Sequence, residues 1–291
     1  MRTLPSSEIP EDYHSYRSHS KAYFDYVMRS EWRNITRVEE DWEYAYIYHY
    51  LFGLFSIAYF EKCDIDPTPV LLRKYGMKRG IVFWSGWKSE KPSGRWWWNL
   101  GYISSHFYHH STRSAFSILD TPEYWKKWSS SARGHRNRII REIESGNIRV
   151  DTDTSFEEFL EVYRKTKVHH KWKRYNIWRQ TYLSENHNAN IRIYTASLDW
   201  DILSGAVFLD DASTSTYLIA FQDDRAKPYH LWLAIIDRWF AESWKIGYKY
   251  LDLDHMRDSL DPLGYAGYTR FKSEIADYDI FTRNLWMKIF V

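Results

Sequence analysis

Residues 131–150 read SARGHRNRIIREIESGNIRV, and residues 156–166 read FEEFLEVYRKT. The first stretch has a basic helical pattern with Gly146 at its end, where glycine commonly stops a helix. The short strand pattern NIRV follows. Ser155 and Glu158 then form a capping box, and the apolar side chains after them recur at helical spacing. The two stretches therefore predict a helix, a strand and a second helix in that order.

The first of these helices is expected to start at Thr121, with Pro122 at its first position. The triple serine at 129–131 and Gly134 are candidate interruptions. Further along, the patterns predict a helix over 177–184 and strands near 191–196, 203–209 and 216–221. A long helix over 229–246 ends at Gly247, and the strand YKYLDLD follows at 248–254.

This succession of elements is the order of the acetyltransferase (GNAT) fold, in which the fourth and fifth strands splay and the acyl group lies between them. Three C-terminal stretches carry a more specific resemblance: LSGAVFLDDASTSTYLIAF at 203–221, LWLAIIDRWFAESWKIGYKYLDLD at 231–254 and GYAGYTRFKSEI at 264–275. Together with residues 131–166 they resemble the Fem family, whose members add amino acids to peptidoglycan precursors. The resemblance covers about residues 115–291.

The N-terminal part is matched to this family by analogy only, because the family carries two GNAT-like halves. Residues 70–119 contain short strand-like runs broken by Gly, Pro and Ser. We therefore expect an α+β fold of layered α/β character with tandem GNAT-like domains, each a mixed, mostly antiparallel sheet flanked by helices. The expected division is 1–120 for a divergent N-terminal half and 121–291 for a C-terminal half that includes the Arg-rich junction helix.

Composition narrows the class of protein. The 291 residues are 44% hydrophobic with a formal net charge of +2, which indicates a globular chain rather than a disordered or strongly basic one. The single cysteine, Cys63, excludes an internal disulfide, and the N-terminus lacks the apolar core of a secretion signal. We expect a cytoplasmic protein. The uncharged stretch 44–60 predicts a buried hairpin or helix, with peripheral membrane contact as the minority alternative.

Basic residues concentrate at the predicted junction. Thirteen Lys or Arg stand against seven acids between Lys126 and Arg174, whereas residues 201–291 hold fourteen acids and ten bases. Such segregation is expected of a protein that binds a phosphate-bearing ligand. We expect substrate binding by Arg136, Arg141, Trp172 and Arg174, the aromatic ring supplying a stacking surface beside the charges; solvated helix faces are the alternative.

The candidate catalytic residues lie in the C-terminal third. The resemblance places a cationic side chain, here Lys272 of the Phe271–Lys272 pair, near the transferred group, where it could stabilise an oxyanion. Asp254 and His255 end the strand YKYLDLD and could orient or deprotonate an attacking amine. Tyr217, on the strand expected to splay, and Phe271 are candidates for substrate contact. A surface lysine, a strand-end carboxylate and a core tyrosine are the structural alternatives.

The sequence gives little evidence for a metal site or for a catalytic cysteine. The histidines at 106, 109 and 110 and at 169 and 170 lack ligands at regular spacing, and Cys63 lacks an arguable His–Asp pairing. We expect no metal and no cofactor. The segment FQDDRAKPYHLW at 221–232 replaces the Gly-rich turn on which acyl-CoA enzymes hold the cofactor pyrophosphate, and Asp223 and Asp224 would repel that anion.

We therefore expect an acyltransferase of the aminoacyltransferase type that moves an aminoacyl or other acyl group from a carrier, with aminoacyl-tRNA a candidate, to an amine of a phosphate-bearing cell-wall precursor. Two alternatives stay open: an acyl-CoA-dependent N-acyltransferase, and an inactive GNAT-like module that binds glycans or peptides. The oligomeric state is not fixed by the sequence.

Overall fold

The computed structural model describes residues 1–4, 8–10, 13, 34–40, 43–61, 63–85, 93–99, 113–167, 191–211, 213–256, 266–281 and 285–291. The chain forms two compact units. The C-terminal unit comprises Phe116–Asp254 and Phe271–Asp277, together with Met1, and the N-terminal unit comprises Arg2–Ala115, His255–Arg270 and Tyr278–Val291.

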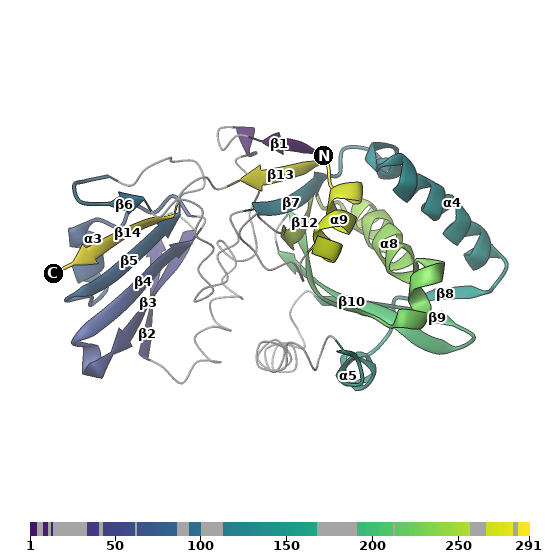
Figure 1. Cartoon of the computed structure of the whole chain (residues 1–291), viewed down its shortest axis with the longest axis horizontal. Helices are drawn as coiled ribbons and strands as arrows, with labels where there is room; N and C mark the ends of the chain where they lie inside the picture. The colour runs from purple at the N-terminus through teal and green to yellow at the C-terminus, as the bar shows by residue number, and fades with distance from the viewer. Residues whose placement is uncertain are drawn as a thin grey trace. The chain divides into compact units, whose positions relative to one another are not determined.

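The described strands form an eight-stranded sheet to which the C-terminal unit contributes most members (Figure 1). Its strands lie in the order β1 (Arg2–Leu4), β13 (Tyr278–Phe281), β7 (Arg113–Ile118), β12 (Tyr250–His255), β11 (Thr214–Gln222), β10 (Asp201–Asp211), β9 (Ile191–Leu198) and β8 (Ile148–Asp151). Strands β8 to β11 pair antiparallel in sequence, and β12 is parallel to β11. The sheet is thus mixed and mostly antiparallel among its described pairs.

Helices cover this sheet because their apolar faces need burial. Helix α8 (Leu231–Ile246) packs on β9 and β10 and against α4 (Ser130–Glu144), while α5 (Phe156–Arg164) also contacts β9 and β10. Figure 1 shows α8 and α5 on opposite sides of β10. The short helix α9 (Ala266–Ile275) follows β12, and the 3-10 turns η3 (Tyr124–Lys127) and η4 (Asp224–Tyr229) precede α4 and α8.

A six-stranded sheet organises the N-terminal unit. Its strands lie in the order β2 (Asn34–Glu40), β3 (Glu43–Tyr50), β4 (Phe55–Glu61), β5 (Gly80–Ser85), β14 (Trp286–Phe290) and β6 (Trp98–Asn99). Helix α3 (Pro69–Lys74) connects β4 to β5 and buries Leu72 in an apolar cluster with Val82 and Trp84. Cys63 belongs to the same cluster and is fully buried.

Two mostly antiparallel sheets flanked by helices confirm the predicted α+β fold. The N-terminal unit also includes His255–Arg270 and Tyr278–Val291 from the C-terminal part of the chain. Strand β14, at the end of the chain, pairs with β5 through Trp286–Trp84 to Phe290–Gly80. Residues 286–290 therefore complete the sheet built by the N-terminal residues.

The uncharged stretch 44–60 forms the antiparallel hairpin of β3 and β4, joined by the 3-10 turn η2 (Leu51–Gly53). This settles the choice between hairpin and helix in favour of the hairpin. Among the described residues, no helix combines the length and the apolar character that crossing a bilayer requires.

The start of α4 corrects one prediction. Thr121 receives a hydrogen bond from the Glu123 amide in a turn, and the helix itself begins eight residues later with Ser129 as N-cap, whose hydroxyl accepts from the Ala132 amide. The triple serine starts the helix rather than interrupting it, since a serine hydroxyl satisfies an N-terminal amide that would otherwise lack a partner. The predicted cap of α5 is confirmed, with Ser155 accepting from the Glu158 amide.

Candidate functional site

The two parallel strands of the C-terminal unit part after a short stretch of pairing. Strands β11 and β12 pair from Thr214–Tyr250 to Thr216–Asp252, and β11 continues to Gln222 without β12 as a partner. A register shift between Val207 and Phe208 of β10 lies beside this point, since Phe208 pairs with Tyr217 and Val207 with Ile219. The bulge reverses the face on which the following residues of β11 lie, so Tyr217 and Ile219 point to opposite sides.

Tyr217 is the first residue of β11 beyond the last pair with β12, and side chains from α8 and α9 surround it. The Phe271 ring meets the Tyr217 ring edge-on with centroids 6.1 Å apart, and the Trp232 ring meets Phe271 at 4.7 Å. The Lys272 ammonium lies 5.8 Å from the centre of the Tyr217 ring. Candidates from two separate segments of the sequence, Tyr217 of β11 and Phe271 and Lys272 of α9, therefore lie side by side.

Burial sets the chemical character of this group. Lys272 is only 5% exposed, which is unusual for a lysine and places its charge in a poorly solvated setting. An ammonium acts more strongly on a developing negative charge there than it would in water. Burial also raises the pKa of the Tyr217 hydroxyl, which is therefore a neutral hydrogen-bond donor at physiological pH.

The end of β12 carries the two remaining catalytic candidates. Asp252 is 1% exposed, and its carboxylate accepts a hydrogen bond of 2.7 Å from the Asp254 amide. This bond accompanies a left-handed backbone at Asp254, with φ of 59°. The alternation of side chains between the two faces of the strand YKYLDLD thus ends before Asp254. Asp254 and His255 are half-buried at the end of the strand, where the backbone changes direction beside the Asp252 carboxylate.

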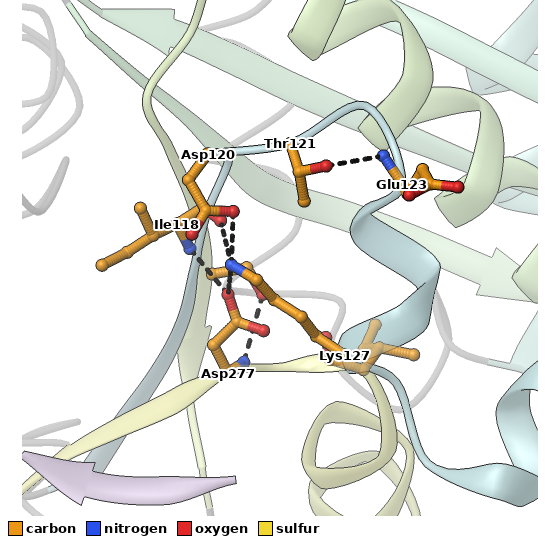
Figure 2. Close-up of polar contacts among 8 residues, drawn as sticks. Ile118, Asp120, Thr121, Glu123, Lys127 and Asp277 are labelled. Atoms are coloured by element: carbon orange, nitrogen blue, oxygen red, sulfur yellow. Dashed lines mark hydrogen bonds and ion pairs between the residues drawn. The ribbon is translucent and has the colours of Figure 1, made fainter.

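Helix α9, which carries Lys272, is anchored by a polar cluster at its C-terminal end (Figure 2). The Asp277 carboxylate accepts from the Ile118 amide at 3.0 Å and lies 3.4 Å from the Lys127 ammonium. Lys127 also pairs with Asp120 at 2.6 Å. Burial raises the pKa of the Asp277 carboxyl, and Lys127 and the Ile118 amide offset this only in part. The cluster ties α9 to the end of β7 and to η3.

A second polar network lies beneath α8. Arg192 of β9 binds the Asp210 carboxylate in two hydrogen bonds of 2.7 and 3.0 Å, and one of its amino groups also donates to Ser215 and Ser243. The Trp239 indole donates to the Ser215 hydroxyl at 2.8 Å. The network joins β9, β10, β11 and α8 just before β11 reaches Tyr217, so it supports the strand that carries the site.

The sequence did not identify Asp277 or Arg192, because their partners are remote in the chain. Ile118 precedes Asp277 by 159 residues, and Ser243 follows Arg192 by 51. An isolated Asp or Arg carries no local pattern that distinguishes such a role.

Arg136 and Arg141 differ in environment, although both lie on α4. The Arg136 guanidinium pairs with Asp237 of α8 at 2.6 Å and stacks over the Trp125 ring at 4.2 Å. This side chain joins two helices, and its part in substrate binding stays a prediction. Arg141 is exposed and donates to the Asn137 carbonyl on its own helix at 3.3 Å. Trp172 and Arg174 lie outside the described residues, as do the histidines at 106, 109, 110, 169 and 170.

The turn between β11 and α8 requires a second correction. Asp224 pairs with both Lys167 and Lys227, and Asp223 pairs with Arg225, which also reaches Asp201. The hydrogen bonds from Lys167 and Lys227 lower the pKa of the Asp224 carboxyl to about 2. Three acids and three bases balance here, so Asp223 and Asp224 do not form an unneutralised negative cluster. These ion pairs reduce the repulsion that a pyrophosphate would meet at this turn.

The conformation of this turn is nevertheless unlike a glycine-rich loop. Residues 224–229 form a 3-10 turn that includes Pro228, and His230 takes the left-handed conformation immediately before α8. The His230 ring stacks on His135 of α4 with centroids 3.7 Å apart, and burial lowers the His230 pKa. Among the described residues, no group of three His, Cys, Asp or Glu side chains is placed to hold a metal ion.

Comparison with solved structures shows the fold. The chain is similar to the crystal structure of FemX, with a TM-score of 0.65 and 10% identity over 93% of this chain and 91% of that one. It is also similar to the C-terminal domain of a putative lysylphosphatidylglycerol synthetase from Agrobacterium fabrum, with a TM-score of 0.52 and 14% identity over 94% and 88%. The L-PGS structure from Bacillus licheniformis gives 0.50 and 14% over 94% and 92%.

No protein-family model matches the sequence, and no curated protein is similar enough to count as a relative. At such low identity the structural likeness establishes the fold alone. The predicted likeness to the Fem-type, GNAT-like fold is confirmed at that level, and the chemistry must be argued from the residues.

Proposed function

We propose that this protein is an acyltransferase whose reaction takes place where β11 and β12 part. The observation that carries the proposal is the position of Lys272: its buried ammonium lies beside Tyr217, the first residue of β11 beyond the last β11–β12 pair. In a GNAT-type fold the acyl group is expected between these two strands. Acyl transfer needs donors for a negative oxygen and an acceptor for a proton. We assign the first role to Lys272 and Tyr217 and the second to the carboxylate of Asp254.

The proposed reaction is attack of an amine on the carbonyl carbon of an activated ester. A C–N bond forms, the carbonyl oxygen becomes negative, and the C–O bond to the carrier then breaks. Lys272 would stabilise the negative oxygen, with the Tyr217 hydroxyl as a second donor. The proton lost by the amine would pass to Asp254 or His255, and the leaving oxygen takes up a proton as the carrier departs. The rest of catalysis is positioning of the two substrates.

We further propose an aminoacyl group as the cargo and an aminoacyl-tRNA as the carrier. The β11–α8 turn, with its 3-10 geometry, Pro228 and the His230 side chain, supports a donor held away from this turn. The proposed acceptor is an amine of a phosphate-bearing cell-wall precursor. The exposed Arg141 on α4 is available for such phosphates, and Trp172 and Arg174 stay candidates from the sequence.

Acyl-CoA is the second candidate donor, and one observation favours it. Ion pairs neutralise Asp223 and Asp224, so a pyrophosphate at the start of α8 would not meet two unpaired carboxylates. This candidate keeps the same proposed reaction centre at Lys272; the bond to the carrier that breaks is then the C–S bond of a thioester, and the leaving sulfur takes up the proton.

The experiment offers the purified protein two labelled donors separately, tRNA charged with labelled amino acids and labelled acetyl-CoA, each with a muramyl-peptide precursor as acceptor. Label transferred from tRNA to the acceptor supports the first donor. Transfer from acetyl-CoA alone assigns the second. Binding of the precursor without transfer from either donor overturns the proposed enzyme and favours a non-catalytic binding module.

A further inference from the structure

The tip of the β3–β4 hairpin presents three large apolar side chains to solvent. Tyr50 and Phe55 form the last pair of the hairpin, and the loop between them reads Leu51, Phe52, Gly53 and Leu54. Leu51 is 71% exposed, Phe52 is 107% exposed and Leu54 is 53% exposed. A soluble surface commonly exposes single apolar residues, but three within four residues of one tip form a patch that calls for a partner.

The backbone of the tip holds these side chains outward. Leu51, Phe52 and Gly53 have positive φ values of 49°, 57° and 83°. This conformation is sterically disfavoured for leucine and phenylalanine, and neither side chain gains burial within the chain in return. Below the tip, His49 bridges two strands: its ring nitrogens lie 2.9 Å from Thr36 of β2 and from Ser56 of β4.

Three backbone polar groups of the tip, at Leu51 and Leu54, have partners within the chain. The Leu51 carbonyl accepts from the Leu54 amide at 3.1 Å, and the Leu54 carbonyl accepts from the Arg79 guanidinium at 2.6 Å. Internal pairing lowers the cost of moving a backbone segment into a medium with little water. At Leu51 and Leu54 this pairing reduces the cost of placing the tip among lipid headgroups.

Positive charge stands at the root of the tip. The Arg79 carbonyl accepts from the Ser56 amide at 2.9 Å, which places Arg79 beside the first residues of β4. Lys78, next to it, is also exposed, and residues 50–60 and 76–85 contain no Asp or Glu. Neither Lys78 nor Arg79 forms an ion pair with another described residue. Apolar side chains beside two exposed bases are suited to a surface whose interior is apolar and whose boundary is anionic.

We propose that residues 51–54 dock this protein on an anionic lipid bilayer, with Leu51, Phe52 and Leu54 entering the headgroup region and Lys78 and Arg79 contacting lipid phosphates. A bilayer accepts a convex tip without a preformed pocket, whereas a protein partner or a second copy of the chain would need a matching concave surface. The proposal is independent of the acyl-transfer reaction, because its test contains no acyl donor or acceptor.

The test is sedimentation of the full chain with vesicles of phosphatidylcholine alone and of phosphatidylcholine with phosphatidylglycerol. The decisive variant is Phe52→Asn, because asparagine accepts the left-handed backbone and removes the apolar ring. The matched control is Trp200→Asn, since Trp200 is 84% exposed and has a φ of 70° at the tip of the β9–β10 hairpin. Both variants should show the thermal unfolding of the wild type.

We expect the wild type and Trp200→Asn to bind the anionic vesicles and Phe52→Asn to bind them at least about tenfold more weakly, because a buried phenylalanine side chain contributes that much or more. Four outcomes would overturn the proposal: a wild type that binds no vesicles, equal binding of Phe52→Asn, equal weakening by Trp200→Asn, or equal binding to neutral and anionic vesicles. Self-association that Phe52→Asn abolishes, without vesicle binding, would assign the tip to a second copy instead.

Discussion

The two units contain the same succession of elements with different outcomes. In the N-terminal unit β3 and β4 pair antiparallel, α3 crosses over, and β5 lies parallel to β4. In the C-terminal unit β10, β11, α8 and β12 repeat this order. Yet β5 is paired with β4 along its whole length, from Ser56–Gly80 to Glu61–Ser85, whereas β12 leaves β11 after three pairs. One topology can thus be paired throughout or part after three pairs, and the proposed reaction centre lies where the pairing ends.

The largest expected effect is a loss of stability when a new side-chain atom is placed between the paired strands β4 and β5. A Cβ at Gly80 would lie 1.7 Å from the Ser56 carbonyl oxygen, and backbone atoms cannot retreat from it within a paired strand. We expect Gly80→Ala to lower the free energy of unfolding by at least about 3 kcal/mol, in the range of severe overpacking and backbone strain. Urea denaturation measures this change.

Two glycines of the C-terminal unit serve as controls. A Cβ at Gly205 would meet the Phe221 ring at 2.6 Å, a side chain that can shift, so Gly205→Ala should cost less than Gly80→Ala. Gly134 on α4 has open space, and Gly134→Ala should add about 0.5–1 kcal/mol through helix propensity. Equal losses for Gly80→Ala and Gly205→Ala would contradict the view that β4 and β5 are closed by backbone contact.

The second difference between the units is the polarity of their cores. The N-terminal cluster around Leu72 and Trp84 is apolar, whereas Arg192 and Asp210 form a nearly buried ion pair under α8. We expect Arg192→Met to cost about 3–5 kcal/mol, because it leaves the Asp210 carboxylate buried without its counter-charge. Thermal or urea unfolding reports the loss.

The matched control for Arg192 is Arg149→Met, which removes the exposed Arg149–Asp151 pair on β8. That pair should contribute only about 0–1 kcal/mol, since solvent screens it. If both variants lose equal stability, the polar network does not support the sheet as described.

The smallest effect concerns the Asp277 cluster, which is part of the C-terminal unit. Burial raises the pKa of the folded-state carboxyl above 3.8, so its contribution to stability is fully present below the unfolded value and is lost as pH rises through the folded value. Asp277→Asn removes this ionisation. We therefore expect the variant to gain stability relative to the wild type as pH rises from below 3.8 through that window.

Urea denaturation of both proteins across this pH range checks the prediction. The difference should become constant at higher pH, where the wild-type carboxylate is fully ionised and keeps Lys127 and the Ile118 amide as partners. A difference that moves in the opposite direction with rising pH would show that Lys127 outweighs burial at Asp277.

Local sequence patterns predicted the individual helices and strands better than they predicted which strands pair with one another. The cap of α5 at Ser155 and the end of α8 at Gly247 each depend on residues a few positions apart, so the sequence contains them. The pairing of β14 with β5 joins residues about 200 positions apart and leaves no local trace. The start of α4 was misplaced because both Thr121 and Ser129 are capable N-caps, and tertiary packing decides between them.

In the candidate site, too, the sequence predicted the residues but not their surroundings. The Phe271–Lys272 pair and Tyr217 were predicted from a family resemblance, and the structure brings them together, but the buried environment of Lys272 is a tertiary property. Arg136 carried the same sequence signal as Arg141, and only the position of Asp237 on α8 distinguishes them. Charge patterns identify basic segments without showing which charges already have partners.

The most direct test of the claim that the open strand pair is the reaction centre is the rate of acyl transfer by Lys272→Met, with whichever donor the wild type uses. Methionine keeps an apolar stem in a 5% exposed position, and thermal unfolding checks that the variant is folded at the assay temperature. The control is Lys165→Met on α5, which removes an exposed lysine of the same unit. We expect a rate about 100-fold to 1000-fold lower for Lys272→Met and a normal rate for Lys165→Met. Full transfer activity in folded Lys272→Met would contradict the claim.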